Sequence, residues 1–417
     1  MTSRAPRPAT RRVVAATGAL AAASMLLAAC GGGGSFGDDK PGDKPAAGGS
    51  INVLIGSSGD AETAAVKDAV AAWSKGSGVK AEVAVAADLP QQLSQGFAAG
   101  SPPDVFYVST DAFAGYAANG SLEPYVDKMD ADFYPTLLDS FTYDGTPYCA
   151  PKDFSTLALV INDDAWAAVG LTDDDYPQTW ADLSAAAAEL TKDGRVGLSF
   201  GPEWQRIGTF MAQAGGHMVD GQGKADVDSP ENVAALDYVK GLLASGHAAY
   251  PSQVDAGWGG EAFGSGKAAM TIEGNWIAGA MKNDYPDVKY TVVPLPKGPA
   301  GEGTLQFTNC WGIAADSTNK DSAVDLVTFL TSDDQQMAFA QAFGVMPSVT
   351  TVADQWAKQF PEQAAFIKGA DHAQGVPAIQ GVADAIADFN AQLEGLSTSD
   401  PKSILSSVQS TLSTIAR

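Results

Sequence analysis

Histidine, cysteine and arginine are all scarce in this sequence, and each shortage excludes a kind of chemistry. Only 3 His and 3 Cys occur among 417 residues. His217, His247 and His372 lie far apart and follow no metal-ligand spacing, so a metal site built on histidine is not expected. Residues 264–269 fit a dinucleotide fingerprint by spacing alone, but they precede a predicted strand instead of following one. We therefore expect neither a metal nor an organic cofactor.

The shortage of arginine bears on the kind of ligand. Beyond residue 29, Arg195, Arg206 and Arg417 are the only arginines. The chain carries 25 Lys+Arg against 49 Asp+Glu, a net charge of −24, which repels nucleic acid and anionic membrane surfaces. Because anionic ligands are usually held by bidentate arginine forks, a phosphate ester or an organic acid is not expected. A neutral sugar and a cation stay open.

A single apolar run approaches the length of a membrane span, and it stands at the N-terminus. Residues 13–29 are apolar and follow a basic stretch that ends in Arg11-Arg12. The run is short for a transmembrane helix and is flanked like a secretory signal peptide. It ends Leu27-Ala28-Ala29-Cys30, which resembles the lipobox of bacterial lipoproteins. The resemblance implies that residues 1–29 are a lipoprotein signal peptide and that Cys30 is lipidated.

Two alternatives remain at this N-terminus. An ordinary signal peptide could precede an incidental cysteine, and Arg11-Arg12 leaves the twin-arginine export route open beside the Sec route. Residues 30–50 are rich in Gly, Asp, Lys and Pro and have almost nothing to bury, which predicts a flexible tether. We therefore expect a lipid-anchored protein at the extracellular face of the cell membrane, which touches the membrane only through its anchor.

The residues beyond the tether show the pattern of an α/β fold. Strands are predicted at 51–55, 79–85 and 105–108, and helices at 60–74, from Asp88, and at 111–119. A hairpin follows on Asp144-Gly145. A second α/β set has strands at 157–161, 196–200, 268–272, 290–293, 305–307 and 312–314. Past Asn319 the expected helices are 320–330, 333–342, 351–368, 377–394 and 401–415.

Several tryptophans stand outside the helical stripes and suggest a site. Trp204, Trp258, Trp276 and Trp311 each lie beside Gly, Pro, Asn or a strand end. Such an indole either packs in the core or stacks on the apolar face of a sugar ring, while polar side chains fix the hydroxyls. Trp276 is the strongest candidate for stacking, because Glu273-Gly274-Asn275 places a carboxylate and an amide directly before it.

The segment that contains Trp276 resembles a known family. Residues 263–276 read Phe-Gly-Ser-Gly-Lys-Ala-Ala-Met-Thr-Ile-Glu-Gly-Asn-Trp, similar to a segment of bacterial extracellular solute-binding proteins of the maltose-binding type, which serve ABC importers. Looser matches occur in order along the chain. They lie at 103–105, 120–124, 177–183, 329–332 and 344–348, so the resemblance covers residues 50–417.

This resemblance implies a two-lobed α/β fold of the periplasmic-binding-protein type, with discontinuous lobes, crossing hinge strands and a helical C-terminal region. Lobe one is expected at 50–153 and 312–370, and lobe two at 154–311 and 371–417. The implied function is capture of a neutral mono- or oligosaccharide between the lobes by a monomer, and its delivery to the permease subunits of an ABC importer. A binding protein for a cation such as a polyamine, or a secreted carbohydrate-active enzyme, is the alternative.

The same resemblance implies which residues line the cleft. Its ligand groups come from the loop after the first strand, from strand ends, and from the loop that holds the tryptophan. The residues at those positions are Ser58, Asp60, Glu62, Asp111, Trp204, Trp258, Glu273, Asn275, Trp276, Asn309, Trp311 and Phe343. It also places Cys149 and Cys310 on neighbouring hinge segments, and an exported compartment permits a disulfide between them. Two buried free thiols are the alternative.

Overall fold

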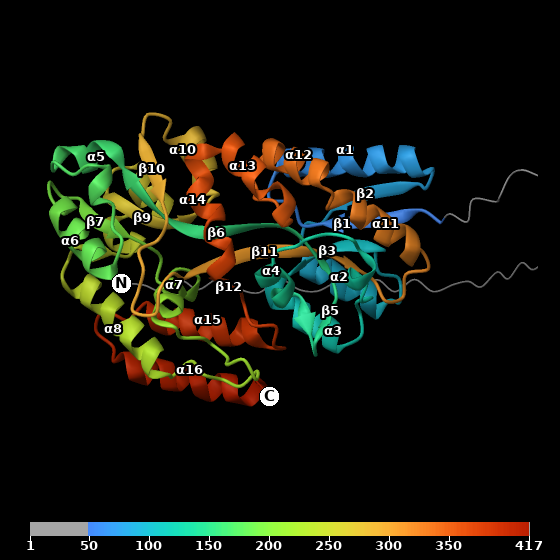
Figure 1. The fold of residues 1–417 in the computed structure, drawn as a ribbon. Coiled ribbons are helices and arrows are strands. Elements are labelled where there is room, and N and C mark those ends of the chain that lie inside the picture. Colours follow the sequence, from blue (N-terminus) through green and yellow to red (C-terminus); the bar gives the residue numbers. More distant parts are fainter. Residues whose placement is uncertain (1–48, 417) are drawn as a thin grey trace, which may run out of the picture. The chain divides into compact units, whose positions relative to one another are not determined.

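The computed structural model describes residues 49–416, so the predictions for the signal peptide, Cys30 and most of the tether lie outside the described residues. The chain begins with a parallel arrangement in which β1 (Ile51–Ile55) pairs with both β2 (Ala81–Val85) and β3 (Val105–Ser109) (Figure 1). The intervening helices are α1 (Asp60–Ser77) and α2 (Leu89–Ala98), and α3 (Thr110–Ala118) follows β3. The side chain of Asp88 caps α2 by accepting a hydrogen bond from the backbone N–H of Gln91.

Two long strands connect this first set of elements to the second. β6 (Ala150–Asn162) and β11 (Thr304–Ile313) pair antiparallel, and together they join both halves of one sheet in the order β2-β1-β3-β11-β6-β9-β7-β8. The sequence pattern predicted strands only at 157–161, 305–307 and 312–314. These predicted strands were shorter than β6 and β11 are in the structure. The polar residues at 152–153 and 308–309 interrupted the apolar pattern, but backbone pairing does not depend on side-chain polarity.

The second set of elements surrounds the other end of the sheet. Its strands are β7 (Val196–Ser199), β8 (Ala248–Ala249), β9 (Ala268–Gly274) and β10 (Tyr290–Val293). Its helices are α5 (Asp163–Ala168), α6 (Trp180–Leu190), α7 (Trp204–Ala214), α8 (Pro230–Ala244), α9 (Gly259–Gly264) and α10 (Ile277–Asp284). Before β6, α4 (Pro135–Ser140) leads into the hairpin of β4 (Thr142–Tyr143) and β5 (Thr146–Pro147). Asp144 and Gly145 both have positive φ there, as a two-residue hairpin turn requires.

The C-terminal region is helical, as expected, but two of its predicted helices are shorter. The elements are α11 (Lys320–Leu330), α12 (Asp333–Phe343), α13 (Ala353–Gln359), α14 (Ala364–Ile367), β12 (Ala373–Gln374), α15 (Val382–Leu393) and α16 (Pro401–Ile415). The expected helix 351–368 breaks at Pro361, which cannot continue the ladder of hydrogen bonds. The expected helix 377–394 begins only at Val382, because Gly381 takes a left-handed conformation.

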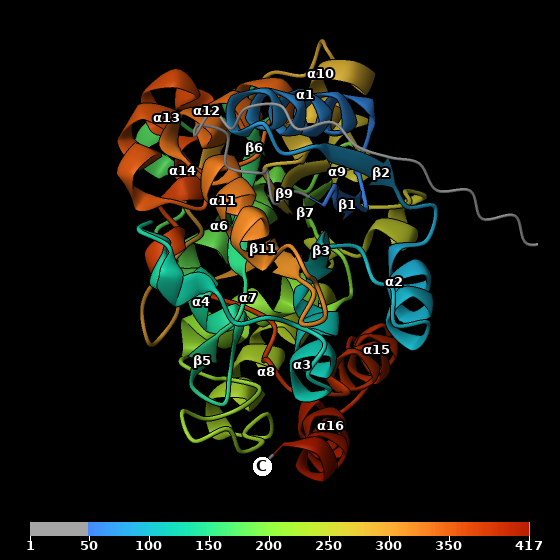
Figure 2. The same ribbon diagram turned by 90° about the vertical axis from the view of Figure 1, so that its right-hand side faces the viewer.

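The apolar side chains form two principal cores. One gathers β1, β3, α1, α11 and α12 around residues such as Val53, Phe106 and Leu326. The other gathers β7, β9, α6, α7, α15 and α16, with Leu198 and Val408 among its members. Thus α15 and α16, at the end of the chain, pack with elements from its middle, and α16 lies against α8 (Figure 2). Within residues 49–416, no helix is both long and apolar enough to cross a bilayer.

Candidate ligand-binding cleft

A cavity of about 580 Å³ lies against the strands that join the two cores. Its size is typical of small-molecule sites, which enclose roughly 300–1,000 Å³. Aromatic rings and uncharged polar side chains make up much of its wall, and its charged residues are Asp111 and Asp153. The aromatic residues are Phe154, Trp276, Phe307 and Phe343. The uncharged polar residues are Ser58, Thr110, Ser155, Gln205, Asn275, Gln306, Thr308, Asn309 and Asn390.

Half of the residues predicted from sequence line this cavity. They come from five separate parts of the chain: the loop after β1, the start of α3, the turn after β9, strand β11 and the end of α12. These residues are Ser58, Asp111, Asn275, Trp276, Asn309 and Phe343. The structure therefore brings together residues that lie up to 285 positions apart, from Ser58 to Phe343.

The other predicted tryptophans are placed elsewhere. Trp311 is 1% exposed and packs edge-on against Tyr107, with ring centroids 4.8 Å apart, so it belongs to the first core. Trp204 is buried in the second core at the start of α7, and it lines a different cavity of about 800 Å³. Trp258 packs partly buried against the first core, where its ring fills the space beside Gly260. The position of a tryptophan beside a glycine or strand end did not distinguish core packing from ligand contact.

The predicted acids also differ from expectation. Asp60 is exposed in the first turn of α1 and does not line the cavity. Glu62 and Glu273 are buried at 3% and 1% exposure, and each is paired with a cation behind the cavity wall. Neither acid lines the cavity, and the carboxylate of each already accepts hydrogen bonds from protein donors.

Glu273 instead fixes the orientation of Trp276 through a hydrogen bond, without lining the cavity itself. The indole N–H of Trp276 donates to Oε2 of Glu273 at 3.0 Å, and the same oxygen accepts from the guanidinium of Arg206 at 2.7 Å. The Arg206 guanidinium carbon lies 5.2 Å from the Trp276 ring centroid, and Phe307 meets the indole edge-on at 5.3 Å. Burial raises the pKa of Glu273, although Arg206 opposes the shift. These contacts fix the indole while leaving 38% of Trp276 exposed.

A second buried network of hydrogen bonds and ion pairs surrounds Glu62 and Lys152. Glu62 accepts hydrogen bonds through one oxygen from both the backbone N–H and the hydroxyl of Ser58, at 2.7 and 2.6 Å. Its other oxygen accepts from Tyr107 and from Nζ of Lys152, both at 3.0 Å. Lys152 also donates to Asp153, which lines the cavity. Lys152 and Asp153 were absent from the predicted ligand-binding residues, because the predicted strand began only at Leu157 and did not include them.

The pKa directions in this network follow from burial and charge. Burial alone would raise the pKa of Glu62, but Lys152 and the bonds from Ser58 lower it below its ordinary value. Burial raises the pKa of Asp153 despite the opposing charge of Lys152, and Glu62 adds to the rise. Burial disfavours the ammonium of Lys152, yet Asp153, Tyr107 and Glu62 together raise its pKa. Lys152 is therefore a permanent cation that already has two carboxylate partners.

Asn275 forms hydrogen bonds with two separate elements that line the cavity. Its backbone N–H donates to the hydroxyl of Ser155 on β6 at 3.0 Å, and its amide donates to the carbonyl of Gly344 after α12 at 2.7 Å. On α15, Asn390 accepts from the backbone of Trp204 and donates to Gln205. These bonds orient the amides at the cavity wall, which is the preorganisation that hydrogen-bonded recognition needs.

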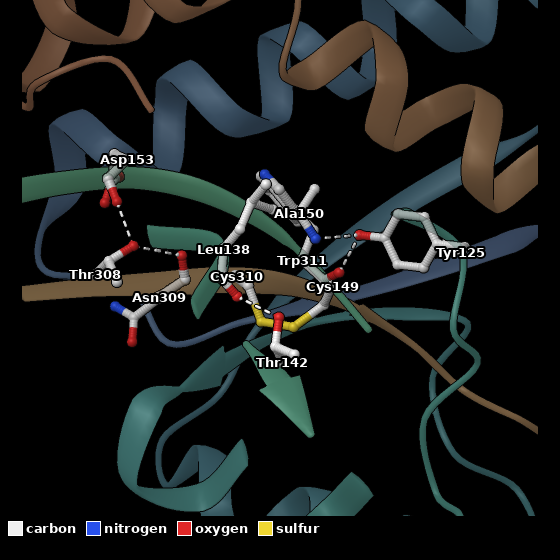
Figure 3. The surroundings of a disulfide bond; sticks show 10 residues. All are labelled: Tyr125, Leu138, Thr142, Cys149, Ala150, Asp153, Thr308, Asn309, Cys310 and Trp311. Atoms are coloured by element: carbon white, nitrogen blue, oxygen red, sulfur yellow. Dashed lines mark hydrogen bonds between the residues drawn. A yellow bond between two sulfur atoms is a disulfide. The ribbon is translucent and has the colours of Figure 1, made fainter. Parts of the chain in front are cut away.

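A disulfide between Cys149 and Cys310 lies beside the cleft, where β6 begins (Figure 3). The Cα atoms are 5.7 Å apart, within the range that such a bond requires, and both residues are buried. Tyr125 secures the same place, because its hydroxyl accepts from the N–H of Ala150 at 3.0 Å and donates to the carbonyl of Trp311. The bond therefore fixes the two joining strands to each other near the ends that lie toward β3.

One stretch of the chain matches the spacing of a hydrolase motif. Residues 197–201 read Gly-Leu-Ser-Phe-Gly, the spacing of a nucleophile elbow. In an elbow the serine stands exposed on a strained turn, whereas Ser199 lies within β7, fully buried and in register with Thr271 of β9. Its hydroxyl cannot reach a ligand. Among residues 49–416 there is likewise no cluster of His, Cys, Asp or Glu that could hold a metal ion.

Two lobes joined by crossing strands, with a polar and aromatic cleft beside the joint, define a solute-binding protein. The sequence agrees: the family model for bacterial extracellular solute-binding proteins matches residues 65–367, and the chain belongs to this family. In fold it is similar to the cyclic alpha-maltosyl-1,6-maltose binding protein of Arthrobacter globiformis. The TM-score is 0.78 at 19% identity, over 88% of this chain and 98% of that one.

Two curated relatives carry the names of different ligands. The diacetylchitobiose binding protein of Streptomyces coelicolor is 27% identical over 284 residues, which cover 65% of this chain and 66% of that protein. The sn-glycerol-3-phosphate-binding periplasmic protein of Escherichia coli is 26% identical over 230 residues, about half of each chain at 49% and 51%. One of these relatives is thus named for a sugar and the other for a phosphate ester.

Proposed function

We propose that this protein captures a neutral mono- or oligosaccharide in the cleft and delivers it to the permease subunits of an ABC importer. The observation that carries the proposal is the composition of the wall: four aromatic side chains among amides and hydroxyls, with no Lys or Arg among the lining residues. Aromatic faces receive the C–H faces of sugar rings, and uncharged polar groups bind hydroxyls without a large desolvation cost.

The buried cations support a neutral ligand over an anionic one. Lys152 is engaged by Glu62 and Asp153, and Arg206 by Glu273 and, at 3.6 Å, by Glu203. In each network the carboxylates outnumber the cation, so a phosphate would meet net negative charge. Phosphate recognition usually needs unengaged bidentate donors. The relative named for diacetylchitobiose is consistent with a sugar ligand. The relative named for glycerol 3-phosphate suggests an anionic ligand, for which no Lys or Arg lines the cavity.

We expect neutral saccharides to stabilise the protein in a thermal-shift screen. A ligand that binds only the folded state and is present at 100 times its dissociation constant adds about 2.7 kcal/mol to stability. The screen would contain diacetylchitobiose, maltotetraose and monosaccharides, with glycerol 3-phosphate as the anionic comparison. Stabilisation by glycerol 3-phosphate and by no sugar would overturn the proposal. A receptor also shows stoichiometric binding without turnover, so released reducing sugar would instead indicate an enzyme.

A cationic ligand is the second candidate, favoured by one observation. Asp111 and Asp153 are the charged residues among those that line the cavity, and both are acids. Carboxylates beside aromatic rings can bind amines through charge and cation–π contacts. Spermidine belongs in the same screen for this reason. Its binding would weaken steeply as salt rises, because it depends on charge, whereas saccharide binding would change little.

We expect ligand to draw the lobes together about the segments 148–153 and 308–311. Ligands bound between domains commonly close them by rotation at a few hinge residues. Small-angle X-ray scattering should give a smaller radius of gyration with saturating saccharide than without it. An identical radius in both conditions, at a concentration where calorimetry shows binding, would mean that the cleft does not close.

We also propose that the protein is exported and held at the extracellular face of the membrane by a lipid on Cys30, after removal of residues 1–29. Membership of an extracellular family supports export, and the Leu-Ala-Ala-Cys sequence at 27–30 supports lipidation. Cells that express the protein should incorporate labelled fatty acid into it, and Cys30→Ala should abolish the label. Retained label in this variant would exclude Cys30 as the anchor.

A further inference from the structure

Lys152 is an extra residue in the hinge strand β6. The register pairs Asn309 with Asp153 but Cys310 with Pro151, so Lys152 has no partner on β11. Neighbouring strand residues normally point to opposite faces of a sheet, and a bulge re-aims one of them. The bulge here places the ammonium of Lys152 against the carboxylate of the next residue, Asp153.

Contacts from lobe one hold this bulge in place. The amide of Gln336 on α12 donates to the carbonyl of Lys152 at 2.8 Å, and the hydroxyl of Ser348 donates to the carbonyl of Pro151 at 2.6 Å. Both Gln336 and Ser348 are buried. The position of Lys152 is therefore imposed by its backbone surroundings, and its charge is not free to move away from the cleft.

The ammonium of Lys152 connects to three residues that line the cleft. It bonds Asp153 directly, and through Glu62 it is linked to Ser58. It also lies 5.8 Å from the ring centroid of Phe343. The side chain of Lys152 is 7% exposed and is not among the residues lining the cavity. It is placed to orient the ligand contacts of this wall without touching ligand.

We propose that Lys152 is a positioning residue for ligand binding, which fixes Ser58 and Phe343 and, through its ion pair, holds the carboxylate of Asp153 in place as a hydrogen-bond acceptor. The proposal rests on the cleft being the ligand site. It assigns Asp153 a fixed role, because an ionised carboxylate accepts only, whereas a protonated one also donates. A ligand hydroxyl or ammonium would therefore meet a reliable acceptor at this place.

Within residues 49–416, Lys152 and Glu62 are the charged groups that act on the ionisation of Asp153, and Asp111 is the other acid lining the same cavity. Lys152 on the same strand favours its charged form, while burial and Glu62 on α1 oppose it. Tyr107 of β3 donates to Glu62, and the neighbours on β11, Thr308 and Asn309, are uncharged. Because Lys152 outweighs Glu62 in this balance, its removal must move the ionisation of Asp153 to higher pH.

The test compares wild type with Lys152→Met and with the double variant Glu62→Gln/Lys152→Met. Lys152→Met leaves two buried carboxylates without a cation and can fail to fold, whereas the double variant leaves one. Affinity for maltotetraose and for diacetylchitobiose would be measured by calorimetry from pH 5 to 8. At neutral pH we expect either variant to bind roughly 2- to 30-fold more weakly, the range seen for residues that act without touching ligand. Lys320→Met, which removes a surface partner of Glu123, is the control and should bind like wild type.

The pH profile separates positioning from a general loss of structure. Affinity should fall as Asp153 becomes protonated, at a pH that rises in the order wild type, double variant, Lys152→Met. Carboxyl NMR of ligand-free protein, with Asp153→Asn to assign the signal, should show the same order. An unchanged Asp153 titration overturns the proposal even if wild type binds neither saccharide, an outcome that would count against the sugar function separately. Unchanged affinity and pH profile in the double variant overturns it as well.

Discussion

Trp276→Ala should lower the affinity for saccharide by roughly 1–3 kcal/mol, about 5- to 150-fold, while the fold stays intact. Trp276 is the most exposed aromatic residue of the cleft at 38%, and its indole is held by Glu273 and Phe307. An oriented, exposed ring of this kind loses little freedom when a sugar stacks on it. Calorimetric titration of the two proteins with the same saccharide measures the difference.

Two further variants test whether the loss of affinity comes from the indole ring of Trp276. Trp276→Phe keeps a ring but gives up the bond to Glu273, so it should lose less affinity than Trp276→Ala. Val85→Ala removes the other large apolar side chain that is exposed within residues 49–416, at 45%, on β2 and not among the residues lining the cavity, and should not change binding. If Trp276→Ala binds as tightly as wild type, Trp276 is not a stacking platform, whatever the fate of the other cleft residues.

Removal of the disulfide should cause the largest loss of stability. The double variant Cys149→Ala/Cys310→Ala opens a loop with a sequence separation of 161 residues. Chain-entropy reasoning gives up to about 5 kcal/mol for a loop of this length, and losses of roughly 2–5 kcal/mol are typical. Alanine suits both positions because both are buried in the first core. The midpoint of urea unfolding should fall in the variant, and reductant should lower it in wild type only.

Mass spectrometry provides the independent control for this bond. Mature protein that lacks Cys30 is unfolded and alkylated without reductant, and it should gain no alkyl group. Gain of two groups would show that Cys149 and Cys310 are free thiols. A wild-type midpoint that is equal with and without reductant would show that the bond adds nothing to stability. Neither cysteine lines the cavity, so saccharide affinity should change less than stability does.

The parts of the fold that were predicted from sequence are determined by interactions between neighbouring residues. The parallel β1, β2 and β3 with their intervening helices followed from apolar periodicity and from caps such as Asp88. The hairpin followed from Asp144-Gly145, whose positive φ few other pairs adopt. These features depend on residues close in sequence. The full length of β6 and β11 did not, since each strand pairs with a distant segment, as Asn309 of β11 does with Asp153 of β6, 156 positions earlier.

Half of the predicted cleft residues line the cavity, among them Trp276 and Asn275, where a suitable residue type coincides with a loop position. Trp204 and Trp311 have similar local sequences but lie in the cores, because packing against distant elements decides whether an indole is buried. Glu62 and Glu273 became structural for the same reason: Lys152 and Arg206, 90 and 67 positions away, engage them. Sequence alone thus determined the fold class, the family and part of the cleft. The tertiary structure decided which charges face the ligand, because burial and pairing depend on contacts between distant residues.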